Sequence, residues 1–184
     1  AMYAMINVVG LAATLVQERQ DGTLPRLIVM PVTRRQILGG KILRGYGLGL
    51  IQFAILLGFG ALLGVNFGRD IPAVILITLV YVLTVAAMAI FMATVARTPE
   101  QASGFGLLVS MTLAPLGGAW WPLEIVPQFM QVIGHISPIA WCMDAFNTIL
   151  YDGGGIPEII VPVLVLLGFA VVFFALGIAR FRYE

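Results

Sequence analysis

The chain has 184 residues, of which 60% are hydrophobic and only 10% are charged, and its net charge is +1. Soluble domains carry roughly 25% charged residues, and no soluble core could bury this much apolar surface, so a water-soluble fold is excluded. A near-neutral chain also argues against a nucleic-acid partner, whose binding needs a clustered basic surface. The single cysteine, Cys142, excludes an internal disulfide and a cysteine-based metal cluster. We therefore expect an all-α, polytopic helical membrane bundle.

Five apolar blocks separated by short polar or Gly/Pro segments predict the membrane spans. They cover residues 2–16, 45–67, 71–96, 103–121 and 159–179, within a single transmembrane domain of residues 1–184. Each block nears or exceeds the roughly 20 residues that a helix needs to cross a bilayer, except the first, which is short. That block begins at Ala1 without a charged flank or a cleavage site, so we expect a span cut at its outer end.

The basic residues predict the orientation. Six of the ten Lys and Arg residues lie in residues 17–44, which should therefore be cytoplasmic. Counting outward, the turn at Arg69 is outside, Arg97 is inside, and residues 122–158, without Lys or Arg, are outside. Arg180 and Arg182 then place the C-terminus in the cytoplasm. Only Arg69, in an outer turn, goes against the rule that basic residues gather on the cytoplasmic side.

The basic segment, residues 17–44, has the pattern of an elbow lying on the membrane face. Thr23 is a suitable cap for a short helix that tolerates Pro25 in its first turn and stops before Pro31. Thr33 and Gln36 then fit a capping box, which predicts a second helix that begins in the cytosol and continues unbroken into the next span. Two interpretations stay open from composition: an interfacial helix held by anionic headgroups, or a docking site for a cytoplasmic partner.

The outer segment predicts a helical hairpin over residues 122–151. Pro122 and Pro127 interrupt the helix, and an amphipathic stripe follows. Ser137 and Pro138 then provide a good start for another helix. The stripe consists of Phe129, Met130, Val132, Ile133 and Ile136.

The ionisable groups nearest the outer leaflet are Glu124, His135 and Asp144. They lie outside the predicted spans, which favours headgroup-level or capping roles over a substrate gate. His135 has no partner at a ligand-like spacing, so we expect no metal site. Trp120, Trp121 and Trp141 indicate an aromatic belt, with the lining of a substrate path as the alternative.

Small residues recur every four positions in the second and third spans, at Gly45 and Gly49, at Gly60, Gly64 and Gly68, and at Ala89 and Ala93. This spacing favours close helix packing within the chain over a dimer seam. The chain has no nucleophile and base arrangement and no phosphate-binding Gly-rich loop, so we expect no enzymatic activity and no cofactor in this chain.

The elbow resembles that of ABC-2 type permeases, the membrane subunits of one class of ABC transporter. The resemblance is carried by Glu18, Arg19, Gly22, Thr23, Leu24, Leu27, Pro31, Arg34, Arg35 and Lys41. In that family the elbow, or coupling helix, docks on a separate ATP-binding subunit, which holds ATP and Mg. This chain departs from the family pattern at Pro25, where Glu is usual.

A second match to the family lies in the outer segment. It is carried by Trp121, Pro122, Glu124, Pro127, Pro138, Trp141 and Asp144, and in bacterial members this region forms a re-entrant hairpin in the outer leaflet that these residues would shape as a gate. The family has six spans, so the chain is similar to spans two to six and is expected to be truncated at its N-terminus.

The resemblance implies an exporter permease in the bacterial or archaeal cytoplasmic membrane, paired with a second permease copy and surrounded by lipid. Family members move drugs, lipids, polysaccharides or ions, and the sequence does not select among them. Two other classes stay open: an unrelated channel or secondary transporter, which should have polar residues in its spans and inverted repeats, and a membrane scaffold without transport.

Overall fold

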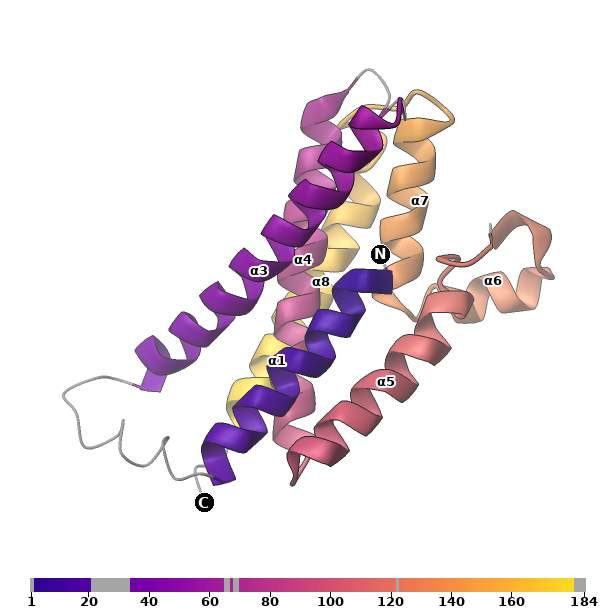
Figure 1. Cartoon of the computed structure of the whole chain (residues 1–184). Coiled ribbons are helices and arrows are strands. Elements are labelled where there is room, and N and C mark those ends of the chain that lie inside the picture. Colours follow the sequence, from indigo (N-terminus) through magenta and orange to yellow (C-terminus); the bar gives the residue numbers. More distant parts are fainter. Residues whose placement is uncertain (1, 21–33, 65–66, 68–69, 122, 181–184) are drawn as a thin grey trace.

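A computed structural model describes residues 2–20, 34–64, 67, 70–121 and 123–180, without the side chains of residues 2–9, 19, 34–38 and 124. Within these ranges the chain forms seven α-helices, one short 3-10 helix and no strand, which confirms the all-α fold (Figure 1). The elements are α1 (Met2–Gln20), α3 (Arg34–Leu62), α4 (Ile71–Val95), α5 (Pro99–Leu116), η1 (Leu123–Ile125), α6 (Gln128–Gly134), α7 (Pro138–Leu150) and α8 (Ile160–Arg180).

A helix stands at each of the five predicted spans. Three helical stretches of the described residues are long and apolar enough to cross a membrane: Gly39–Leu62 in α3, all of α4 and all of α8. With 19 and 18 residues, α1 and α5 are shorter or less apolar and do not meet that standard. The chain is therefore a multi-pass helical membrane protein, and the first and fourth predicted spans, at α1 and α5, stay predictions.

The helix ends follow from local chemistry. The carboxylate of Asp70 accepts a hydrogen bond from the Ala73 amide and caps α4, and the Thr98 hydroxyl does the same for Gln101 in α5. The predicted fourth span extends to residue 121, but α5 ends at Leu116 because Gly118 takes a φ of +77°, a conformation that glycine adopts without strain. Helix α3 runs unbroken from Arg34 to Leu62, as expected of a helix that continues into the next span, and its capping box at Thr33 lies outside the described residues.

Helix α4 is the centre of the bundle. It packs against α1, α3, α7 and α8, and Ile77, Tyr81 and Ile90 on it are fully buried. Besides packing, the Thr84 hydroxyl lies 2.9 Å from the carbonyl oxygen of Leu166 and so links α4 to α8 by a hydrogen bond. Figure 1 shows α8 beside α4 along its length, whereas α3 lies beside α4 at one end and diverges from it toward the N-terminus of α3.

Three helix termini and one turn lie toward the same end of the molecule, which we call the basic end. These are the C-terminus of α1, the N-terminus of α3, which stands apart from the others, the turn between α4 and α5, and the C-terminus of α8 (Figure 1). The Gln20 side chain donates a hydrogen bond to the Arg97 carbonyl across this end. Lys41, Arg44, Arg97 and Arg180 lie in or beside these termini, whereas residues 122–158 carry no Lys or Arg.

Candidate functional site

The predicted docking elbow is described only at its flanks. Glu18 lies in the last turns of α1 and Lys41 in the first turns of α3, and their side chains form an ion pair. This pair joins the two helices that enter and leave the elbow. The helical backbone also includes Arg19, Arg34 and Arg35, whose side chains lie outside the described part.

The centre of the elbow lies outside the described residues. This applies to Gly22, Thr23, Leu24, Leu27 and Pro31. Its short helix and its contacts with a partner therefore stay predictions.

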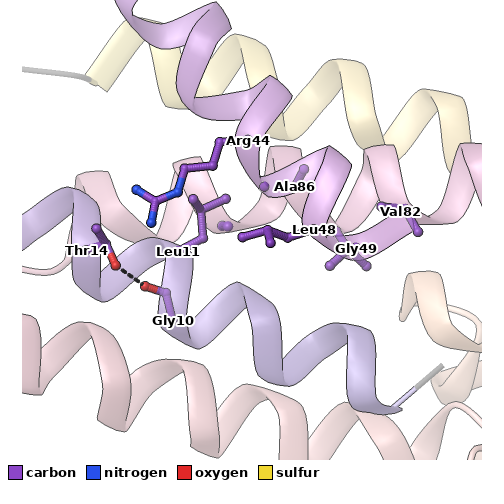
Figure 2. Close-up of a pocket in the computed structure, with 11 residues that line it drawn as sticks. Gly10, Leu11, Thr14, Arg44, Leu48, Gly49, Val82 and Ala86 are labelled. Atoms are coloured by element: carbon purple, nitrogen blue, oxygen red, sulfur yellow. Dashed lines mark hydrogen bonds between the residues drawn. The ribbon is translucent and has the colours of Figure 1, made fainter. Parts of the chain in front are cut away.

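A cavity of about 140 Å³ lies between α1, α3 and α4, and we call it the Arg44 cavity (Figure 2). Arg44 extends from α3 toward α1, and Leu11, Leu48, Val82 and Ala86 line the apolar part. Two glycines of α3 bring the walls together: a Cβ on Gly45 would overlap the Leu11 side chain, and one on Gly49 would lie 2.5 Å from Val82 Cγ1. The glycine spacing seen in the sequence thus serves packing within the chain.

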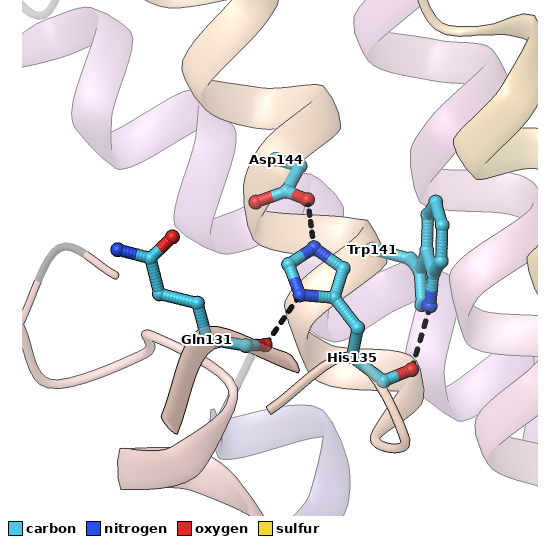
Figure 3. Close-up of polar contacts among 4 residues, drawn as sticks. All are labelled: Gln131, His135, Trp141 and Asp144. Carbon is cyan, nitrogen blue, oxygen red and sulfur yellow. Dashed lines mark hydrogen bonds and ion pairs between the residues drawn. The ribbon is translucent and has the colours of Figure 1, made fainter. Parts of the chain in front are cut away.

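The outer segment contains a polar cluster around His135, between α6 and α7 (Figure 3). The His135 Nδ1 and Nε2 atoms each lie 2.7 Å from an oxygen, the Gln131 carbonyl and the Asp144 carboxylate respectively. The Trp141 indole donates to the His135 carbonyl at 2.8 Å, and the two rings meet edge to face at 5.0 Å. Gln131, His135, Trp141 and Asp144 form what we call the His135 clasp, which ties the end of α6 to α7.

The clasp favours a charged histidine. A carbonyl and a carboxylate only accept hydrogen bonds, so only the imidazolium, with an N–H on each nitrogen, donates to both. Partial burial by itself lowers the pKa of His135, but the hydrogen bonds to Gln131 and Asp144 and the charge of Asp144 outweigh it, so the pKa lies above its ordinary value. The contact between α6 and α7 is therefore strengthened by protonation.

The structure places the other predicted outer residues in helix starts and in a second cavity. Pro127 is the N-cap of α6, and Pro138 is the first residue of α7, where the Ser137 hydroxyl accepts from the Ile139 amide as the sequence predicts. Pro122 lies outside the described residues, and Glu124 is in η1 with its side chain not described.

The second cavity, of about 550 Å³, opens between the segment after α5 and the far part of α7. Trp120 and Trp121 line it together with Asn147, Tyr151 and Asp152. Both tryptophans thus border a cavity. This position fits both interpretations that the sequence left open, an aromatic belt and the lining of a substrate path. The re-entrant hairpin itself stays a prediction.

Some functional contacts escape the sequence. Asp70, which caps α4, also accepts a hydrogen bond from the Ile156 amide at 3.2 Å and so ties the start of α4 to the loop before α8. The Arg44 cavity has no sequence signal beyond the two glycines, because it depends on how α3 diverges from α1. Within the described ranges, no three His, Cys, Asp or Glu side chains gather as metal ligands would.

The chain is similar to known transporter subunits over nearly its whole length. A family model described as an ABC-2 family transporter protein matches residues 1–179. The linearmycin resistance permease protein LnrN of Bacillus subtilis is 34% identical over 98% of this chain and 47% of its own length. The inner membrane transport permease YhhJ of Escherichia coli is 30% identical over 97% of this chain and 48% of its own.

A more distant relative is the probable multidrug ABC transporter permease YbhR of Escherichia coli, which is 26% identical over 76% of this chain and 39% of its own length. No solved structure matches the chain. The chain spans about half the length of the curated relatives it matches. The family model covers far more than half of the chain, so this chain belongs to the ABC-2 family of transporter proteins.

Proposed function

We propose that the chain is the membrane-spanning part of a permease subunit of an ATP-driven exporter. The observation that carries the proposal is the family match over residues 1–179, together with the relatives' names, which describe resistance, transport and multidrug permeases. The sequence contains no phosphate-binding loop, so this chain supplies no ATPase site and the energy comes from a separate ATP-binding subunit that holds ATP and Mg.

We propose that the elbow contacts that subunit. The two flanks of the elbow lie at the basic end, which supports this location. The ion pair of Glu18 with Lys41 and the hydrogen bond of Gln20 with the Arg97 carbonyl link α1 to α3 and to the turn between α4 and α5. A force on the elbow is therefore transmitted to several helices at once. Such coupling drives transport only if the ATP-binding subunit favours one arrangement of the bundle over another.

The remaining parts of the proposal concern assembly and location. We propose a dimer with a second permease copy, in the cytoplasmic membrane of a bacterium or archaeon, with the basic end and the C-terminus in the cytoplasm. The collection of basic residues at one end supports this orientation. The relatives' names make linearmycin and multidrug substrates the first to test.

The test uses the full-length permease in proteoliposomes with its ATP-binding subunit. We expect substrate movement that requires ATP and both subunits. The variants Gly22→Trp and Thr23→Trp should leave ATP hydrolysis running while transport is lost, because bulk in the elbow uncouples the subunits. Gly168→Trp is the matched control, since Gly168 is exposed on α8 and a Cβ added there would meet no atom within 4 Å, and it should transport normally.

The outcomes separate the candidate functions. Unchanged transport in the elbow variants would contradict the role of the elbow. Substrate movement without ATP or the second subunit would indicate a channel or secondary transporter, and no movement under any condition would indicate a scaffold.

A further inference from the structure

The Arg44 cavity has the lining of a site for an amphiphile. Its polar side chains are Thr14 and Arg44, and the Thr14 hydroxyl already donates to the Gly10 carbonyl at 2.8 Å (Figure 2). The other lining residues are apolar or are glycine and alanine. A water molecule needs two to four polar partners to be held in a cavity, so this lining favours an apolar occupant with one polar end.

The charge at the mouth of the cavity indicates which polar end fits. Lys41, one helical turn before Arg44, is paired with Glu18, and Glu100 is exposed at the start of α5. In the ranges that the structure describes, no ion pair joins Arg44 to an acidic side chain. A guanidinium binds phosphate through parallel hydrogen bonds, which makes a phosphate group the complementary partner.

The depth of Arg44 matches the level of lipid phosphates. The stretch Gly39–Leu62 of α3 is about 36 Å long at 1.5 Å per residue, against roughly 30 Å for the hydrocarbon core, and Arg44 lies within two turns of its start. Arg44 is therefore near the boundary between the hydrocarbon and the headgroups. The apolar lining residues Leu48 and Gly49 follow it toward the membrane centre, and so does Leu11 of the antiparallel α1.

The size of the cavity limits what enters it. About 140 Å³ is close to the volume that holds one benzene molecule in an engineered apolar cavity. The cavity therefore takes a short stretch of an acyl chain rather than a whole lipid. The Glu18–Lys41 ion pair lies on its basic-end side, and the close contacts at Gly45 and Gly49 narrow its walls.

We propose that the Arg44 cavity binds an anionic phospholipid, with the phosphate on the Arg44 guanidinium and the adjoining acyl segment between α1 and α3. The lipid then fills the space between α1 and α3, directly beside the Glu18–Lys41 ion pair that joins the two flanks of the elbow. This site does not depend on ATP or on transport, so it is testable on the permease alone.

The experiment measures lipid retention by native mass spectrometry on the purified full-length permease, offered phosphatidylglycerol or phosphatidylcholine with the same acyl chains. We expect the wild-type protein to retain phosphatidylglycerol preferentially. Arg44→Gln should reduce that retention about fivefold, the change that corresponds to loss of one basic residue near anionic headgroups. Arg44→Lys should keep much of it, and Arg180→Gln, which removes an exposed arginine at the same end, should leave it unchanged.

Three results would overturn the proposal. Equal retention by the wild-type protein and Arg44→Gln shows that the cavity does not hold the lipid. Displacement of the bound lipid by millimolar glycerophosphate shows a site for free phosphate, in which the acyl segment contributes nothing. A loss of dimer in Arg44→Gln with lipid retention unchanged shows that a second copy or another part of the longer protein occupies the cavity.

Discussion

Helices α3 and α4 are both long and apolar enough to cross a membrane, yet they have opposite positions in the bundle. Of the apolar stretch of α4, 72% is buried inside the protein, against 11% for α3. Lipid tails are as apolar as leucine, so hydropathy does not distinguish a helix surrounded by protein from one surrounded by lipid. What distinguishes them is the share of side chains that fit against protein: most of α4 is buried, whereas α3 contacts its neighbours along one side, through Gly45, Gly49 and Phe53.

The largest effect should come from removing side-chain volume at the centre. Ile90 on α4 is 1% exposed and Ile55 on α3 is 66% exposed. Ile90→Ala should lower the free energy of unfolding by about 2 kcal/mol because it leaves a cavity. Ile55→Ala, the matched control, should change it by less than about 0.5 kcal/mol. Unfolding of the purified protein in mixed micelles measures both, and equal effects would remove the distinction between the helices.

Adding volume should affect α3 only where a glycine contacts another helix. Gly49→Val should cost about 1.5 kcal/mol because its Cβ would meet Val82 of α4 at 2.5 Å. Gly47→Val makes the same change in the same helix where no atom lies within 4 Å, so it controls for helix propensity. The same unfolding assay should separate the two variants. A Gly47 variant as unstable as the Gly49 variant would mean that α3 does not approach α4 through Gly49.

The His135 clasp should depend on pH, unlike the contacts of α3 and α4. Because the folded-state pKa of His135 is raised, its stabilisation is fully present below the ordinary pKa of about 6.5 and is lost as pH rises through the raised value. Among described side chains, Asp144 is the acid that faces it, and the side chain of Glu124 in η1 is not described.

Measured from pH 5.5 to 8.5, stability should fall by at most about 1 kcal/mol, since the pair is partly exposed. Asp144→Asn should reduce this dependence, and Asp152→Asn, at an exposed acid of the second cavity, should preserve it. A stability that rises with pH in the wild-type protein relative to Asp144→Asn would contradict the clasp.

The smallest expected effect concerns a single hydroxyl of the central helix. The Thr84 hydroxyl lies 2.9 Å both from the Val80 carbonyl of its own helix and from the Leu166 carbonyl of α8, whereas the Thr78 hydroxyl donates only within its own helix, to Val74. Thr84→Val should cost about 0.6 kcal/mol more than Thr78→Val, the average for a hydrogen bond between membrane helices. Comparing the two single variants in the unfolding assay checks this. No difference would mean that packing alone holds α4 against α8.

The sequence predicts those features of the molecule that depend on residues close together along the chain. The start of α7 follows from its Ser137 cap and the adjacent Pro138, a pattern a few residues long. The His135 clasp joins residues nine positions apart across a turn, for which no spacing rule exists. The Gly45 and Gly49 pattern predicts close approach but does not name Leu11 or Val82 as the neighbours, because spacing on one helix carries no information about the other.

The proposed docking of the elbow on an ATP-binding subunit is tested most directly by photo-crosslinking in native membranes. A photoreactive amino acid at Thr23, in the elbow, is compared with one at Tyr151, which is 83% exposed beside the second cavity. We predict that the full-length permease crosslinks to the ATP-binding subunit from Thr23 and not from Tyr151. Crosslinks from Tyr151 and none from Thr23 would contradict the orientation and the role of the elbow together.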